Sequence, residues 1–91
     1  MVTNPYKEER IGENVFRRTF SDLTDSVELK WHQDWEDRTV EFICKNDWMI
    51  QIDNELPKPC LGVHHIPRGV WHRIIKGTGD LEVLVTKHSD T

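Results

Sequence analysis

Short apolar runs alternate with turn-forming clusters along most of this 91-residue chain. The runs are rich in Val, Ile, Phe, Trp and Thr, and the clusters between them are rich in Gly, Pro, Asn, Asp and Ser. The runs after residue 20 are residues 27–32, 39–44, 48–53, 62–66, 71–75 and 81–87. No window has a sustained helical period, and only residues 22–27 allow a short helix instead. The pattern predicts an all-β domain of short antiparallel strands, closed as a barrel or a sandwich.

Alternation within two of the runs predicts which side chains face the core, because successive strand residues point to opposite sides. The polar residues of these runs, such as Thr39 and Glu41, take the opposite phase. The sets expected to face inward are Val40, Phe42 and Cys44 in one run and Trp48, Ile50 and Ile52 in the next.

The run before them has an unusual pattern, with one aromatic face and one ionisable face. A surface strand would place the ionisable set in water and the tryptophans in the core. A strand lining a pocket would turn His32 and Asp34 inward, and Lys30 with them by parity. Trp31 and Trp35 would then lie in a second layer or a subunit contact. The residues alone leave both arrangements open.

Length and composition suggest one compact domain, since 91 residues with 36% hydrophobic content leave no room for a second core. Residues 1–12 are mostly polar and suit a frayed arm or an edge strand that completes its pairing on a neighbour. We therefore expect the barrel domain to comprise residues 13–91.

The charge and the cysteine content indicate which partners and which cellular compartment to expect. The net charge of −4 and the scattered Lys and Arg residues argue against a nucleic-acid partner. The sequence has no long apolar run and no signal-peptide pattern, so we expect no membrane partner and a cytoplasmic location. Cys44 and Cys60 lack CxxC spacing, which favours two reduced thiols over a disulfide.

Residues 62–74, GVHHIPRGVWHRI, resemble the second motif of the cupins. In that motif a glycine strand leads to Pro-x-Gly-x-x-His, and Pro67, Gly69 and His72 hold these three places. The position of the upstream glycine differs from the family pattern, because Gly62 is one residue closer to the proline than in the family. Lys76 stands where the family has an asparagine.

The first cupin motif, His-x-His followed by Glu and then Gly, is matched less closely. His32 holds the first place and Asp34 the place of the second histidine. Arg38 stands at the glutamate spacing, and Lys45 stands where the glycine would be. The resemblance extends from about residue 28 to residue 87.

The resemblance implies a small single-domain cupin-like jelly-roll barrel with its site at the open mouth, and it favours His32, Asp34 and His72 pointing inward. Two imidazoles and one carboxylate suit a single divalent transition metal such as Fe, Mn, Ni or Zn, with open coordination positions. Against a metal stands Arg38, which is able to pair bidentately with Asp34 and satisfy that carboxylate. A metal-free pocket is equally compatible with these residues.

His64 and His65 are adjacent, so only one of them is expected to face the barrel interior, as a pocket residue or as a hydrogen-bonded core histidine. The expected pocket set is His32, Asp34, Arg38, His64, His65 and His72. GxSxG, P-loop and GxGxxG motifs are absent, and catalysis is neither indicated nor excluded.

Two functions follow. In the first, the pocket binds a metal ion or a small polar or anionic molecule, with Arg38 gripping an anionic group. In the second, the pocket is a closed hydrogen-bonded network without metal, and the chain is a non-catalytic homodimeric assembly module. Trp31 and Trp35 are expected to cover the homodimer interface. Arg38 distinguishes the two functions, because a free guanidinium recognises anions and one locked to Asp34 is structural.

Overall fold

The computed structural model describes residues 6–23 and 27–88. Eight strands and one short 3-10 helix make up this part of the chain. They are β1 (Lys7–Gly12), β2 (Val15–Phe20), the 3-10 helix η1 (Val27–Leu29), β3 (Asp37–Phe42), β4 (Met49–Ile52), β5 (Lys58–Pro59), β6 (Gly62–Ile66), β7 (His72–Ile75) and β8 (Leu81–His88). Among the described residues, no helix has the length and apolar character needed to cross a membrane.

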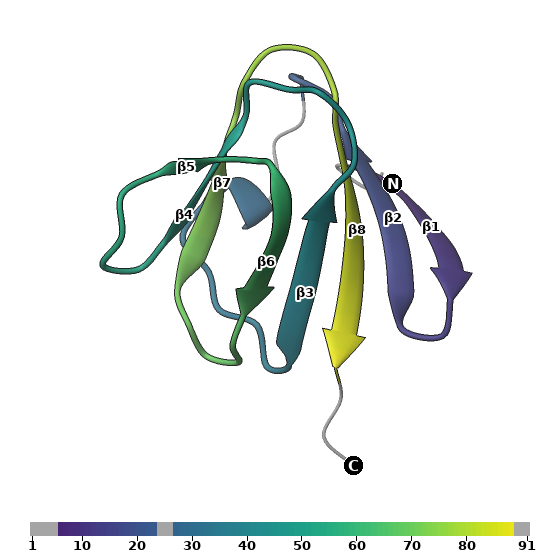
Figure 1. The fold of residues 1–91 in the computed structure, drawn as a ribbon, viewed down its shortest axis with the longest axis vertical. Helices are drawn as coiled ribbons and strands as arrows, with labels where there is room; N and C mark the ends of the chain where they lie inside the picture. Colours follow the sequence, from purple (N-terminus) through teal and green to yellow (C-terminus); the bar gives the residue numbers. More distant parts are fainter. Residues whose placement is uncertain (1–5, 24–26, 89–91) are drawn as a thin grey trace.

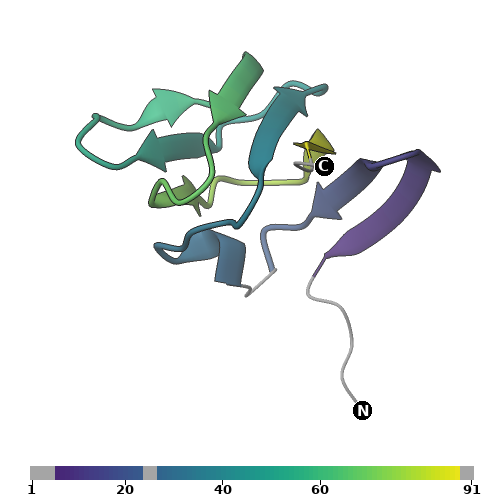
Figure 2. The ribbon, with the colours of Figure 1, turned by 90° about the horizontal axis from the view of Figure 1, so that it is seen from below.

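The strands form two antiparallel sheets (Figures 1 and 2). The larger sheet has the order β1-β2-β8-β3-β6, and the smaller one has the order β5-β4-β7. Strands distant in sequence are therefore neighbours, as where the last strand, β8, lies between β2 and β3. The all-β prediction is confirmed, and the fold is jelly-roll-like.

The core lies between the two sheets and is built by alternation within the strands. The predicted inward residues Val40, Phe42, Trp48 and Ile50 are buried, and β8 adds Leu81, Val83 and Val85 to the same cluster. Each such side chain contributes roughly 1.5–3 kcal/mol by leaving water. Cys44 and Ile52 are only half-buried, because they lie beyond β3 and at the end of β4.

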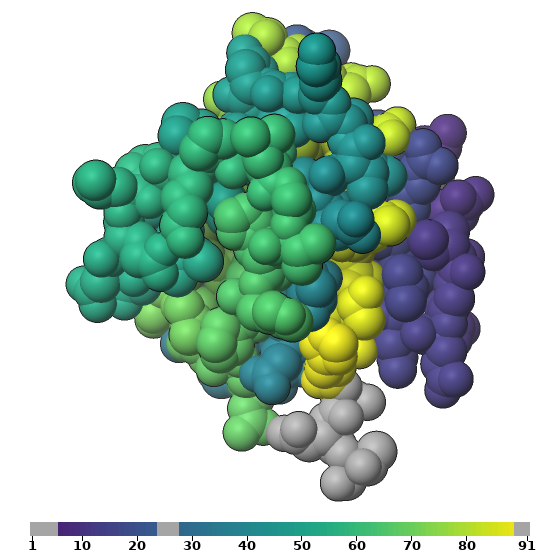
Figure 3. Space-filling model, in the orientation of Figure 1, coloured from purple at the N-terminus to yellow at the C-terminus, as the bar shows by residue number. Residues whose placement is uncertain are grey.

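The sequence allowed a loose arm or an edge strand for residues 7–12. These residues form β1 at the edge of the larger sheet and pair with β2 of the same chain. A turn with Asn14 at φ +63° connects the two strands. All six residues of β1 are exposed, and four of them are charged. Charged side chains on an edge strand discourage pairing with another chain. The space-filling view shows β1 and β2 along one side of the molecule (Figure 3).

The prediction of a strand over residues 27–32 was wrong. Residues 27–29 form η1, and only His32 pairs, through an isolated bridge to His72. The two backbone hydrogen bonds of this bridge are both 3.0 Å long. Because the 3-10 turn breaks the two-residue period, Lys30 is exposed and does not follow His32 inward. The alternative helix over residues 22–27 falls largely on residues 24–26, which lie outside the described residues.

A candidate metal centre between the sheets

The turn that precedes β7 is tied to the segment containing Asp34. Gly69 adopts φ +82°, a conformation that glycine accepts without strain. Its N–H donates to the carbonyl oxygen of Asp34 at 2.9 Å, and its own carbonyl accepts from the Gln33 side chain at 2.8 Å. The Pro-x-Gly turn and the 33–34 segment therefore hold each other in place, which fixes His72 relative to Asp34.

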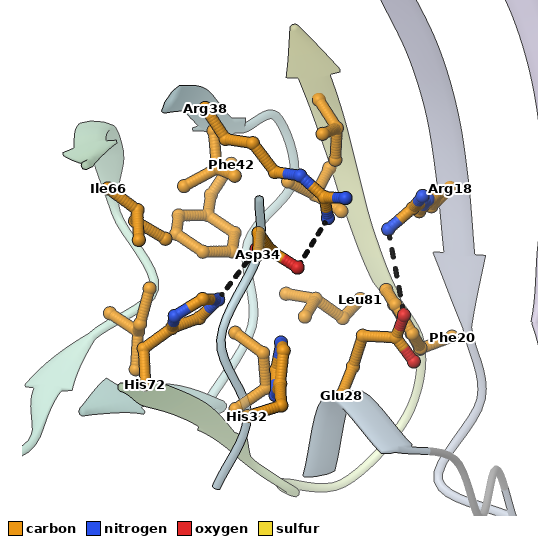
Figure 4. Close-up of a pocket in the computed structure, with 15 residues that line it drawn as sticks. Arg18, Phe20, Glu28, His32, Asp34, Arg38, Phe42, Ile66, His72 and Leu81 are labelled. Carbon is orange, nitrogen blue, oxygen red and sulfur yellow. Dashed lines mark ion pairs between the residues drawn. The ribbon is translucent and has the colours of Figure 1, made fainter. Parts of the chain in front are cut away.

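His32 and His72 lie side by side and point into the space between the sheets (Figure 4). Their backbones are directly bridged, and directly opposed residues of antiparallel segments face the same side. Their ring centroids are 4.2 Å apart. The bridge thus brings two imidazoles from distant parts of the chain together.

Both imidazoles are oriented by a hydrogen bond to a backbone carbonyl. His32 Nδ1 lies 2.7 Å from the carbonyl oxygen of Lys30, and His72 Nδ1 lies 2.8 Å from that of Val70. A carbonyl oxygen only accepts, so each Nδ1 carries the proton. In the neutral ring the Nε2 atom then presents a lone pair. This is how metal-binding histidines are commonly held in proteins.

Asp34 lies beside these rings, with a side chain only 10% exposed. Its Oδ1 is 3.2 Å from Nη1 of Arg38, and its Oδ2 is 3.1 Å from Nε2 of His72. Oδ2 is buried and accepts no well-directed hydrogen bond from any described residue. Burial alone would raise the pKa of Asp34. When Nε2 of His72 is protonated, its contact with Oδ2, together with the positive charge of Arg38, outweighs burial and holds this pKa below the usual 3.8.

The three side chains border a cavity of about 40 Å³. Its remaining walls are mainly apolar and come from both sheets, including Phe42, Ile50, Ile66, Leu81 and Val83 (Figure 4). A single water requires roughly 10–15 Å³ measured in this way. The cavity therefore has room for an ion with one or two waters, and not for the larger ligands that fill pockets of roughly 300–1,000 Å³.

Arg18 and Glu28 also line the cavity, and sequence reasoning missed both. Arg18 is almost fully buried, and its Nε donates to Glu8 at 2.7 Å while Glu28 lies 3.8 Å from its Nη1. The Tyr6 ring lies 4.9 Å from the guanidinium carbon of Arg18. The two-residue alternation of β2 could have indicated that Arg18 faces inward, because Arg18 lies between Phe16 and Phe20 on one face of the strand.

Two guanidiniums and the carboxylates that bind them surround the cavity. Arg38 contacts Asp34 and, at 2.8 Å, Glu36, so each buried guanidinium has two carboxylate neighbours. Of these carboxylates only Glu28 and Asp34 line the cavity, so its wall carries two positive and two negative charges when the histidines are neutral. Glu8 and Glu36 bind the same guanidiniums from outside the lining, with side chains 32% and 25% exposed.

The structure brings together four of the six predicted pocket residues, namely His32, Asp34, Arg38 and His72. His64 is on the inner face of β6, but its Nε2 bonds the carbonyl oxygen of Leu61 at 2.9 Å and its ring stands against Phe42. His65 points to the outer face. Neither of these two adjacent histidines lines the cavity.

The triad fits a metal ion. One ligand atom from each of His32, Asp34 and His72 lies within 4.8 Å of the other two. Bonds of about 2.0–2.2 Å to one ion would require only a modest contraction of this triangle. Oδ2 of Asp34 is buried and has no hydrogen bond within the part of the chain that the structure describes, and it is the atom that such an ion would satisfy.

No protein-family model matches the chain, and no curated protein matches its sequence. Solved structures with the same fold include the following three. A protein from Neisseria meningitidis has a TM-score of 0.62 at 14% identity, covering 97% of this chain and 89% of that one. A cupin domain from Bordetella pertussis Tohama I has a TM-score of 0.58 at 15% identity, covering 92% of each chain.

The third is a conserved protein of unknown function from Streptococcus pyogenes, with a TM-score of 0.63 at 15% identity. The match covers 94% of this chain and 75% of that one. These likenesses concern the fold, which is that of a small cupin-like protein with its pocket between two antiparallel sheets.

Proposed function

We propose that this chain is a small cupin-fold protein that binds one divalent transition metal ion through Nε2 of His32, Nε2 of His72 and Oδ2 of Asp34. One observation carries the proposal. Backbone carbonyls hold both Nδ1 protons, so both Nε2 lone pairs are left to face a buried carboxylate oxygen that accepts no hydrogen bond from the described residues. Two lone-pair donors and an anionic oxygen repel one another unless a cation or a proton lies between them.

The position of Arg38 supports a metal over an anionic ligand. Its guanidinium is occupied by Asp34 and Glu36 and is not free to grip an anion in the pocket. The contact with Asp34 uses Oδ1 and leaves Oδ2 for the metal. The arginine is thus compatible with a metal, although its positive charge lowers the affinity of the site for the ion.

The donor set limits the chemistry that a bound metal would bring. Two imidazoles and one carboxylate suit Fe, Mn, Ni or Zn and leave positions open for water or a small ligand. Such an ion acts as a Lewis acid and lowers the pKa of bound water. The apolar walls would exclude bulk water from the site, and His32, His72 and Asp34 would provide its protein ligands.

Elemental analysis of untagged, chelator-free protein tests the proposal. After stripping and reloading with Zn(II), Mn(II), Ni(II) or anaerobic Fe(II), the wild type should retain close to one ion per chain. His32→Ala and His72→Ala should lose it. His64→Ala is the matched control, because this histidine lies outside the cavity, and it should retain the ion. Absence of retained metal in the wild type, or equal retention in His32→Ala, would refute the proposal.

A second candidate function, a homodimeric assembly module, is favoured by exposed tryptophans. Trp31, Trp35 and Trp71 are 41%, 74% and 46% exposed. Exposed aromatic surface of this extent often marks an interface. Light scattering at micromolar concentration should then give twice the chain mass, and Trp31→Ala with Trp35→Ala should reduce it. A monomer mass for the wild type would exclude this function.

The cytoplasm is the compartment we propose, and it is supported by the thiols. Cys44 and Cys60 are both free. Thiols persist in this state where glutathione and thioredoxin keep them reduced. Fractionation of the source cells, with the protein detected in the cytoplasmic fraction, would support this proposal, and detection only outside the cytoplasm would refute it.

A further inference from the structure

Two histidines outside the inner cavity meet on the outer face of the larger sheet. β6, β3 and β8 are adjacent strands (Figure 1), and they contribute His65, Thr39 and His88 respectively. Thr39 is directly opposite His65 in the strand register, and His88 is opposite Asp37 two residues away on β3. His65 and His88 are exposed, and their ring centroids are 6.5 Å apart.

The two rings converge on one oxygen atom. Thr39 Oγ1 lies 2.9 Å from His65 Nδ1 and 2.7 Å from His88 Nε2. Two imidazole nitrogens that approach the same point from different strands have the arrangement of a two-histidine metal chelate. An ion would lie beside this oxygen, which is bonded to Cβ of Thr39, and both rings would turn toward the ion to form bonds of about 2.0–2.1 Å.

The threonine side chain does not block such an ion. Its hydroxyl oxygen faces both rings and would serve as a weak ligand of an ion that lies between them. His65 Nε2 and His88 Nδ1 have no hydrogen-bond partner among the described residues, so both rings are able to reorient slightly without breaking another contact.

A groove adjoins this pair. It has a volume of about 350 Å³ and is lined by Asp37, Arg38, His65, Ile66, Pro67 and His88. Asp37 brings a carboxylate to its border, with one oxygen bound to the N–H of Arg68 at 2.8 Å. The Arg38 guanidinium is held by Asp34 and Glu36 and adds no free positive charge to the groove.

We propose that His65 and His88 form a second, external binding site for a divalent transition metal ion such as Zn(II), Ni(II) or Cu(II). Neutral imidazole suits these ions, and Asp37 contributes a neighbouring negative charge. Arg38 and Ile66 line both this groove and the inner cavity, so the external site lies against the wall of the inner one. The external site does not depend on metal binding by His32, Asp34 and His72.

The experiment uses untagged full-length protein in which the inner site has been removed by His32→Ala and His72→Ala. Equilibrium dialysis against Zn(II) or Cu(II) at pH 7.5 should give one bound ion per chain. Adding His65→Ala or His88→Ala should weaken this binding by at least about tenfold. Adding His64→Ala, the neighbouring histidine on the opposite face, should leave it unchanged.

A second measurement covers the case in which the inner-site variant does not fold. In the wild type, sub-stoichiometric Cu(II) broadens NMR signals of nearby nuclei, and the rings of His65 and His88 should broaden together. Loss of broadening at His88 on His65→Ala would support a shared ion. Independent broadening of the two rings, or dialysis binding unaffected by either substitution, would overturn the proposal. If His32, Asp34 and His72 bind no metal, the binding that depends on His65 should still be observed.

Discussion

Replacing Arg38 by methionine should separate the structural and metal-related roles of Asp34. The Arg38 and Asp34 side chains are 15% and 10% exposed, and Arg38 also contacts Glu36. The substitution keeps most of the side-chain volume but leaves two carboxylates without their cation. Breaking a buried ion pair from one side costs about 3–5 kcal/mol. The free energy of unfolding of the metal-free protein should fall by this amount at pH 7.

The metal-bound variant should recover much of the loss. An ion bound to Oδ2 of Asp34 supplies the positive charge that methionine removed, and the repulsion between that ion and the Arg38 guanidinium disappears. Recovery of about 1.4 kcal/mol corresponds to a tenfold gain in metal affinity. Arg38→Met should therefore be less stable than the wild type without metal and should bind metal at least about tenfold more tightly.

Urea unfolding at pH 7, with chelator and with excess Zn(II), measures both effects. Arg17→Met is the matched control, because Arg17 pairs with Glu82 at 3.0 Å on the exposed face and its side chain is 45% exposed. The free energy of unfolding of Arg17→Met should fall by no more than about 1 kcal/mol. The reasoning fails if Arg38→Met costs no more than this control. It also fails if Zn(II) stabilises the Arg38→Met variant less than the wild type.

Three further predictions concern protons, thiols and a close-packed glycine. The metal-free protein should lose stability as the pH falls through the lowered pKa of Asp34, because a carboxylate with a depressed pKa stabilises the fold only while it is ionised. Urea unfolding between pH 5 and pH 2 should show a flatter pH dependence for Asp34→Asn, and an unchanged slope would contradict this. Burial raises the pKa of Cys60 to about 12, so iodoacetamide at pH 8 should label the half-buried Cys44 first in peptide mass spectra, whereas equal labelling would be contrary evidence. Gly77→Ala would place a Cβ within 2.8 Å of a backbone carbon and a tryptophan ring and should cost about 1–3 kcal/mol in thermal unfolding. Gly12→Ala, with no neighbour closer than 3.7 Å, serves as its control, and equal effects of the two would refute the packing argument.

The sequence was sufficient for the strands and for much of the core because regular strands have a strict two-residue period. Val40, Phe42, Trp48 and Ile50 follow that period and are buried. The Pro-x-Gly turn before His72 was also readable, since Gly69 adopts the positive φ that this residue type tolerates.

The segment around His32 was less predictable because its backbone is irregular. Alternation assigns faces only where a strand is continuous, and η1 interrupts the strand expected over residues 27–32. The inward orientation of His32 depends on a single bridge to His72, a contact between residues 40 positions apart. Local pattern contains no information on such a contact.

Charge pairing across the cavity was missed for a related reason. Arg18 and Glu28 come from β2 and η1 and approach each other only after the chain folds. The partner of Arg38 was predicted in part, because Asp34 is near in sequence, whereas Glu36 was not considered. The predicted anion-binding role of Arg38 weakened once both carboxylates were seen to occupy it.

The two proposed metal sites differ in how firmly their rings are held, and this difference sets the order in which they should fill. His32 and His72 each have Nδ1 fixed by a backbone carbonyl, and they face a buried anionic oxygen. His65 and His88 are exposed and are both hydrogen-bonded to the hydroxyl of Thr39. Ligands that are already oriented lose less conformational entropy on binding, and charge attraction is stronger away from water. A titration of the metal-free wild type should therefore fill the inner site first and the external site at higher metal concentration.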